Sequence, residues 1–179
     1  TNPWYNAVYE CVETAMDDFA AATGRQYKPF EFYGHPQAER VIVIMGSAIG
    51  TCEEVVDELL SRGEKVGVLK VRLYRPFSAA HLLEALPPST QAVAVLDRTK
   101  EPGSQAEPLY LDVMTALAEA FNRGERETLP RTIGGRYGLS SKEFGPECVL
   151  AIFKELSAAK PKPRFTVGIY DDVTNLSLA

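Results

Sequence analysis

The chain has 179 residues, of which 45% are hydrophobic and 24% charged, and its formal net charge is −5. These values predict one globular domain with a sizeable core, and the acidic balance argues against DNA or RNA binding, which requires clustered lysine and arginine. The three cysteines, Cys11, Cys52 and Cys148, include no CxxC pair, so they predict reduced thiols in the cytoplasm and neither a zinc site nor an iron–sulfur site.

Residues 1–39 differ in pattern from the rest of the chain. Residues 5–22 have helical periodicity with five apolar side chains on one face, Val8, Val12, Ala15, Met16 and Phe19, and Gly24 ends the helix. The segment GRQYKPFEFYGHPQAER holds two prolines and several aromatic residues. We expect it to be an extended connector that leads from a preceding domain and stays outside the sheet.

A regular alternation of strands and helices begins at Arg40. Predicted strands are Val41–Met45, Val66–Val71, Ala92–Leu96, Thr128–Gly135 and Phe165–Ile169, and predicted helices are Thr51–Leu60, Ala79–Ala85, Ala106–Asn122 and Gly145–Ala158. This order predicts an α/β fold over residues 40–170, with a doubly wound, mainly parallel sheet of about five strands and helices on both faces. Residues 171–179 are interpreted as a linker to a next domain. The chain begins without methionine, and we expect it to be a piece of a longer protein.

Two strand-to-helix loops end with the sequence signature of a capping box. Thr51 with Glu54, and Ser104 with Glu107, have the spacing in which both side chains bond the first backbone N–H groups of a helix. The glycine-rich loop before the first of these helices contains Gly46, Ser47 and Gly50. It matches neither nucleotide-binding fingerprint, which favours a structural turn. A direct phosphate site is the alternative.

Charged residues gather in two further loops that follow strands. Asp97, Arg98, Lys100 and Glu101 lie within five positions, and they form either a solvated loop with mutual ion pairs or a polar contact surface for another domain. The loop after Val71 combines Arg72, Tyr74 and Arg75 and reads as an anion site or a packing corner. The loop 134–142 reads as a mobile surface loop, with binding as the alternative.

No catalytic constellation or metal site is recognisable in the sequence. His35 and His81 have no nucleophile or ligand cluster near them in the sequence and are interpreted as structural. Asp171 and Asp172 read as an acidic turn, with a cation site as the alternative. The longest apolar run, Val41–Met45, is too short to cross a membrane.

Three motifs carry a resemblance to a known family. LYRPF, LDRTKEPG and GGRYGLSSKEF occur in this order, and from about Tyr33 onward the chain resembles the second domain of pyruvate:ferredoxin (flavodoxin) oxidoreductase. The resemblance implies a fold similar to the C-terminal domain of transketolase. It also implies a much longer parent enzyme, which oxidatively decarboxylates pyruvate to acetyl-CoA and CO2 and passes electrons to ferredoxin or flavodoxin.

The resemblance implies that the parent enzyme is a cytoplasmic homodimer that holds thiamine diphosphate, Mg and [4Fe-4S] clusters. It also implies that this stretch binds none of these cofactors. By this interpretation the chain is a non-catalytic part, inactive in isolation, and Arg72, Tyr74, Arg75, Asp97, Arg98, Lys100 and Glu101 are candidate contacts to other domains of the same polypeptide. Contact of Arg72, Arg75 and Lys100 with the phosphates of coenzyme A is a further expectation. The alternatives are the same domain of an enzyme for another 2-oxoacid, or a free-standing module that binds an anionic ligand.

Overall fold

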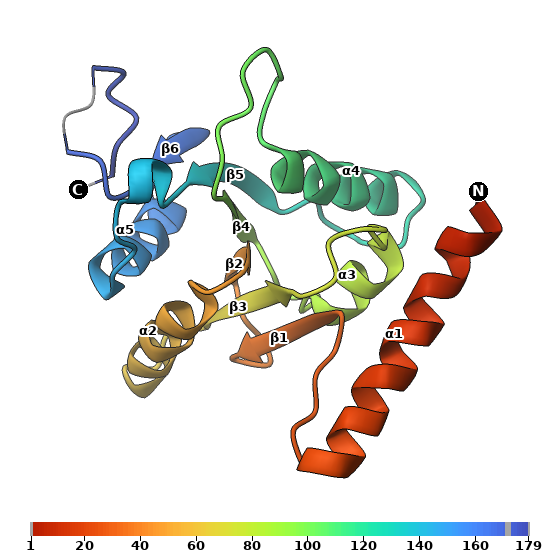
Figure 1. The fold of residues 1–179 in the computed structure, drawn as a ribbon. Helices are drawn as coiled ribbons and strands as arrows, with labels where there is room; N and C mark the ends of the chain where they lie inside the picture. Colours follow the sequence, from red (N-terminus) through yellow and green to blue (C-terminus); the bar gives the residue numbers. More distant parts are fainter. Residues whose placement is uncertain (1, 171–172, 179) are drawn as a thin grey trace.

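A six-stranded sheet forms the centre of the molecule (Figure 1). The structure, a computed structural model, describes residues 2–170 and 173–178. The strands are β1 (Phe30–Gly34), β2 (Arg40–Met45), β3 (Val66–Val71), β4 (Ala92–Asp97), β5 (Arg131–Arg136) and β6 (Arg164–Thr166). They lie in the order β1-β3-β2-β4-β5-β6, and all neighbours are parallel except β1, which runs antiparallel to β3.

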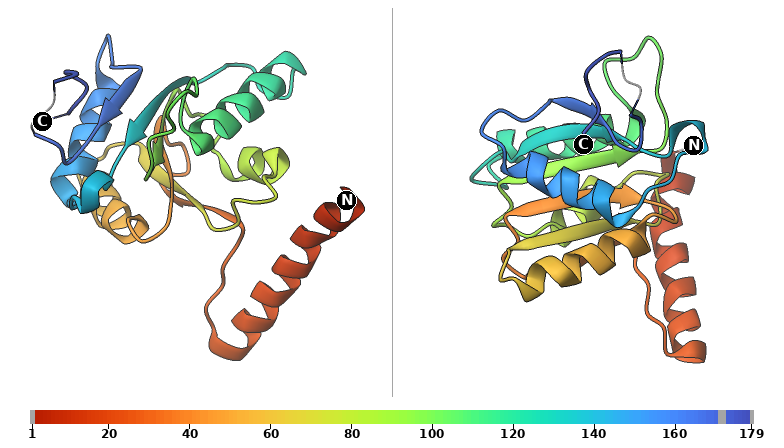
Figure 2. Two further views of the ribbon diagram at one scale, coloured as in Figure 1. Left: turned by 45° about the horizontal axis from the view of Figure 1, so that its top comes forward. Right: turned by 90° about the vertical axis from the view of Figure 1, so that its left-hand side faces the viewer.

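Helices cover both faces of this sheet (Figure 2). These are α2 (Ile49–Ser61), α3 (Ala79–Ala85), α4 (Pro108–Asn122) and α5 (Pro146–Ser157). A further helix, α1 (Asn2–Thr23), covers neither face, and a short 3-10 turn lies at Leu139–Ser141. The strands β2, β3 and β4 carry mainly apolar residues on both faces, since α2 and α5 pack on one side of them and α3 and α4 on the other. The predicted doubly wound α/β fold is confirmed.

Successive residues of β2 enter opposite halves of the core. Ile42 and Ile44 belong to the cluster beneath α2 and α5, whereas Val41 and Val43 belong to the cluster beneath α3 and α4. The side-chain period of two in a strand explains this division. The uninterrupted apolar run therefore supplies two cores at once.

The prediction that the connector stays outside the sheet was wrong. Phe30–Gly34 forms β1, a strand beyond the five that were predicted, at one edge of the sheet. Phe30 is buried, and Gly34 lies opposite Gly67 so closely that a Cβ on Gly34 would collide with the Gly67 backbone. The alternating apolar residues of FEFYG are the pattern of an edge strand.

Both predicted capping boxes were also wrong, because each helix begins at a different residue. Helix α2 begins at Ile49, two residues before Thr51, and Ala48 at its N-cap makes no side-chain capping bond. Helix α4 begins at Pro108 with Glu107 at the N-cap, and again the N-cap side chain makes no such bond. The first donors of α4 are capped instead by a side chain at the end of the preceding strand, β4, as described below.

The two ends of the described chain are attached differently. Helix α1 has no buried residue and stands apart from the sheet in Figure 1, with Trp4 81% exposed. Near the other end, the backbone around Ser177 bonds to Thr166 and extends the edge formed by β6. Asp171 and Asp172 lie outside the described residues. Among the residues that are described, no helix has the length and apolar character needed to cross a bilayer.

Candidate interdomain contact site

The strand order directs attention to one end of the sheet. From β2 the chain crosses to β3 on one side and then to β4 on the other, so the order reverses between β2 and β4. In open α/β sheets, functional sites gather beyond the carboxyl ends of the strands at such a reversal. A hollow of about 300 Å³ lies there, and it is lined by residues that follow β2, β4 and β5, among them Ser47, Arg98, Tyr137 and Lys142.

Asp97, the last residue of β4, turns into the protein. Its side chain is 2% exposed, and its two carboxylate oxygens accept hydrogen bonds from the backbone N–H groups of Leu109 (2.9 Å) and Tyr110 (3.1 Å). These are donors of the first turn of α4, which have no partner inside the helix. Burial raises the pKa of Asp97 above its ordinary value, although the two hydrogen bonds act in the opposite direction. Asp97 therefore caps α4 from within and is not on the surface.

The remaining charged residues of this loop lie at the surface, and the side chain of Arg98 lines the hollow and packs against Gly138. Arg98, Lys100 and Glu101 are exposed, and none of them takes part in an ion pair in the part of the chain that the structure describes. Figure 1 shows the loop between β4 and α4 projecting beyond the sheet and helices. The expected mutual ion pairs of a solvated loop are therefore absent from these described residues.

The base of the same loop is rigid because buried charges hold it at both ends. Asp97 fixes one end, and at the other Glu107 accepts a 2.6 Å hydrogen bond from the Nε of Arg136 on β5. Both partners of this ion pair are largely shielded from solvent. Both ends of the projecting loop are therefore bonded to the body of the domain.

The residues Arg72, Tyr74 and Arg75 follow β3, and their side chains contact other residues of the same domain. Arg72 pairs with Glu31. Arg75 stacks on the ring of Tyr74 at 3.8 Å, and both reach Asp112 of α4, Arg75 by a 2.7 Å ion pair and Tyr74 by a 2.9 Å hydrogen bond. Burial and the bond to Asp112 raise the pKa of Tyr74 to about 12. This geometry is that of a packing corner.

The structure does not bring Arg72, Arg75 and Lys100 together on shared partners. Arg72 is engaged with β1, Arg75 with α4, and Lys100 lies on the projecting loop. A clamp for the phosphates of coenzyme A from these three side chains has no support in their contacts. The two histidines make local hydrogen bonds, and His81 also stacks on Tyr9 at 4.4 Å.

The glycine-rich loop after β2 adopts a tight turn. Gly46 has a φ of +88°, a conformation that favours glycine, whereas Gly50 lies inside α2. Ser47 lines the hollow described above, and no acidic residue lies in the first turn of α2. The phosphate interpretation of Gly46, Ser47 and Gly50 stays a prediction.

One charged group was missed in the sequence. Lys70 of β3 is 3% exposed and pairs with Glu31 of β1 and with Glu53 of α2, the latter at 2.8 Å. A buried lysine requires such partners because an unpaired buried charge is costly. The signal was a lysine inside the apolar run VGVLKV, and the network it forms ties the edge strand to α2.

A sequence profile described as pyruvate:ferredoxin oxidoreductase core domain II matches residues 38–139 of this chain. The chain belongs to this family. The match includes β2, β3 and β4, the carboxyl-end loops and most of the hollow between them. The resemblance predicted from the three motifs is confirmed.

Longer relatives agree with the family match. The chain is 86% identical over 178 residues to a probable pyruvate-flavodoxin oxidoreductase of Escherichia coli, and 59% identical over 180 residues to a pyruvate-flavodoxin oxidoreductase of Rhodospirillum rubrum. It is 55% identical over 177 residues to a pyruvate:ferredoxin oxidoreductase of Moorella thermoacetica. Each alignment covers 99% of this chain and 15% of the relative, so the chain spans about 15% of the length of these proteins.

Among solved structures, the chain is similar to a 2-oxoglutarate:ferredoxin oxidoreductase from Magnetococcus marinus with 2-oxoglutarate, coenzyme A and succinyl-CoA bound. The TM-score is 0.45 at 25% sequence identity, and the alignment covers 72% of this chain and 20% of that one.

Proposed function

We propose that this chain is the second core domain of a pyruvate:ferredoxin or pyruvate:flavodoxin oxidoreductase, and that it serves there as an interdomain docking domain. The family match and the names of the relatives support the parent activity. That activity is the oxidative decarboxylation of pyruvate to acetyl-CoA and CO2, with electrons passed to ferredoxin or flavodoxin. In this proposal residues 1–39 lead from the preceding domain, residues 40–170 form the domain, and residues 171–179 lead to the next.

The observation that carries the docking role is the loop between β4 and α4. Its charged residues Arg98, Lys100 and Glu101 are exposed and make no ion pair with the described residues, whereas its base is fixed by Asp97 and by Glu107. Charge-assisted hydrogen bonds across an interface fix the relative orientation of two domains. The contact surface is therefore centred on the projecting loop, and Arg72, Tyr74 and Arg75 support its surroundings from inside the domain.

In this proposal the cofactors of the parent are held by its other parts. A [4Fe-4S] cluster takes four cysteine thiolates, whereas this chain has three cysteines, one exposed on α1 and two buried on α2 and α5. Within residues 2–170 and 173–178, no group of three or more histidine, cysteine, aspartate or glutamate side chains could hold a metal ion. Thiamine diphosphate, Mg and coenzyme A are assigned to the rest of a cytoplasmic homodimer.

A chimera tests the docking role. This chain replaces the matching segment of the Escherichia coli relative, and Arg98→Ala with Lys100→Ala is compared with Lys154→Ala and Lys160→Ala. The two control lysines are exposed, one in the last turn of α5 and one after that helix. Loss of charged hydrogen bonds at an interface lowers pyruvate-dependent flavodoxin reduction by about tenfold for the loop variant, and the control leaves it unchanged. Equal rates for the two double variants contradict docking through this loop.

Calorimetry on the isolated chain separates docking from ligand binding. Titration with coenzyme A and, separately, with thiamine diphosphate is expected to give no heat, while the same sample melts cooperatively. Stoichiometric micromolar binding of either compound contradicts a purely docking role. It would direct attention to the hollow beside Ser47 and Arg98.

A further inference from the structure

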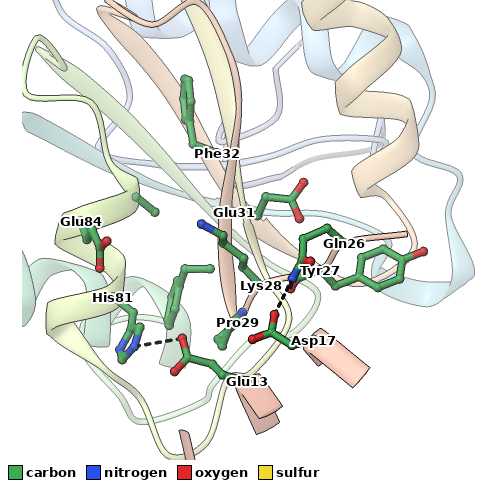
Figure 3. A pocket seen from close by; sticks show the side chains of 12 residues that line it. Glu13, Asp17, Gln26, Tyr27, Lys28, Pro29, Glu31, Phe32, His81 and Glu84 are labelled. Atoms are coloured by element: carbon green, nitrogen blue, oxygen red, sulfur yellow. Dashed lines mark hydrogen bonds and ion pairs between the residues drawn. The ribbon is translucent and has the colours of Figure 1, made fainter. Parts of the chain in front are cut away.

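A groove of about 540 Å³ runs along the edge of the sheet formed by β1. One wall comes from α1, one from α3, and the floor from the residues that lead into β1 and from β1 itself (Figure 3). The lining residues are Glu13, Asp17, Gln26, Tyr27, Lys28, Pro29, Phe30, Glu31, Phe32, His81, Glu84 and Ala85. The groove lies apart from the projecting loop, which contributes no residue to it.

The outer edge of β1 has main-chain groups available for pairing. Arg72 donates its backbone N–H to Pro29, and His35 donates to Val66, both across the ladder between β1 and β3. In an antiparallel pair these contacts occur at every second residue, so residues 29, 31, 33 and 35 face β3. Phe30, Phe32 and Gly34 therefore direct their N–H and C=O groups away from it. Outside the ladder, no backbone hydrogen bond among the described residues reaches these three positions.

The wall formed by α1 leaves this groove open. The helix has no buried residue, and its attachment to the body of the domain includes a 3.0 Å hydrogen bond from the Tyr9 hydroxyl to the carbonyl of Pro76 and the stacking of Tyr9 on His81. Near its C-terminal end, Asp17 accepts a 3.0 Å hydrogen bond from Gln26 of the connector. A helix held at these points keeps a space beside the strand edge.

The charge of the lining selects the kind of segment that fits. Glu13, Asp17 and Glu84 face the groove, and Figure 3 shows them around the start of β1. Glu31 also lines it but is already paired with Lys70 and Arg72. Against these acids the lining offers Lys28 and His81, the latter 3.5 Å from Glu13. Glu84 makes no side-chain hydrogen bond or ion pair with the described residues. An entering lysine or arginine side chain would find carboxylates on both walls.

We propose that the groove accepts an extended segment carrying lysine or arginine, which adds to β1 as a further strand and comes from the remaining part of the same long polypeptide. Addition of a strand to an exposed sheet edge is an established mode of peptide recognition, in which the main chain supplies the hydrogen bonds. The occupant is assigned to the same polypeptide because the relatives continue for about 85% of their length outside this domain, as the 15% coverage implies. The proposal rests on the proposed function and names a second contact of the docking domain.

Hydrogen exchange at individual amides tests this pairing. The amides of Phe32 and Gly34 are measured in the isolated 179-residue chain and in the active chimera with the Escherichia coli relative. Added pairing slows exchange of these outward amides at least about tenfold in the chimera. The amides of Glu31 and Tyr33, which face β3, serve as internal controls and change little.

Two charge variants of the chimera test the preference for a basic segment. Glu84→Lys, on the α3 wall, is expected to remove most of the added protection at Phe32 and Gly34. Glu10→Lys makes the same charge change at an exposed position of α1 that does not line the groove, and it is expected to leave the protection intact.

An active chimera in which Phe32 and Gly34 exchange as fast as in the isolated chain overturns the strand-addition proposal and leaves the proposed function standing. An inactive but folded chimera contradicts the proposed function instead. Protection that appears in the isolated chain and rises with its concentration also overturns the proposal, because the occupant is then a second copy of the chain.

Discussion

Replacing Asp97 with alanine removes the acceptor of two buried backbone donors at the start of α4. The N–H groups of Leu109 and Tyr110 lose their partners at 2.9 and 3.1 Å, and both residues are buried. A buried donor left without a partner costs about 1–3 kcal/mol, and loss of a helix cap costs about 0.5–2 kcal/mol. Release of a carboxylate from an unfavourable buried site offsets part of this cost.

The expected loss is about 2–4 kcal/mol in the free energy of unfolding for Asp97→Ala. Asp97→Asn keeps one acceptor oxygen and turns an amide N–H2 toward the second donor, so we expect a smaller loss of about 1–2 kcal/mol. Urea unfolding followed by circular dichroism measures both as a lower midpoint at an unchanged slope. Glu101→Ala, on the exposed part of the same loop, is the control and stays within about 0.5 kcal/mol of the parent.

The pH dependence gives an independent check on the same carboxylate. Burial raises the pKa of Asp97 above its ordinary 3.8, so the folded chain holds this proton more tightly than the unfolded chain. Stability therefore rises as the pH falls through the folded pKa toward 3.8, and the Asp97→Asn variant lacks this contribution.

If Asp97→Ala unfolds at the same urea concentration as the parent, the capping argument is refuted.

Three further predictions concern other parts of the domain. Burial opposes ionisation of Glu31, but its two cationic partners lower its pKa on balance. Its contribution to stability is therefore present above pH 4.5 and is lost as the pH falls through the folded pKa. The stability difference between the parent and Glu31→Gln should shrink in acid, and a constant difference from pH 7 to 3 would contradict this. Gly135→Ala forces a Cβ into the ring of Phe165 and should cost about 1–3 kcal/mol in thermal or urea unfolding, whereas Gly50→Ala, which meets no atom within 4 Å inside α2, should be neutral or stabilising; equal effects would refute the packing argument. Cys11 is exposed, whereas burial raises the pKa of the Cys52 thiol to about 12, so a thiol reagent should label Cys11 in the folded chain and reach Cys52 only after unfolding.

Local periodicity was sufficient for most of the secondary structure. The runs Val41–Met45, Val66–Val71 and Ala92–Leu96 each lie within a strand of the structure, because continuous apolar residues of strand length have to be buried on both faces. Pattern alone misjudged the strand Phe30–Gly34. The alternation covers only five residues in a segment that holds two prolines, and its partner, β3, lies more than thirty residues further along the chain.

The candidate site was also predicted only in part. The sequence pointed to the loop after β4 and to its charged residues, and it identified the family through LYRPF, LDRTKEPG and GGRYGLSSKEF. It could not separate Asp97 from Arg98, because adjacent residues of a strand end point in opposite directions and only the packed helix α4 decides which one is buried. The two capping boxes were wrong because the residue at which each helix begins also depends on packing in the folded domain.

By itself, then, the sequence determined the fold class, the order of the elements and the family, since these depend on which residues must be buried and on contiguous motifs. Tertiary structure alone decided which charged groups are free to contact a partner. Arg75 and Asp112, Lys70 and Glu53, and Glu107 and Arg136 become neighbours only after strands and helices pack. A charge is available for docking only when no such partner lies within reach, and that depends on distances that the chain order does not specify.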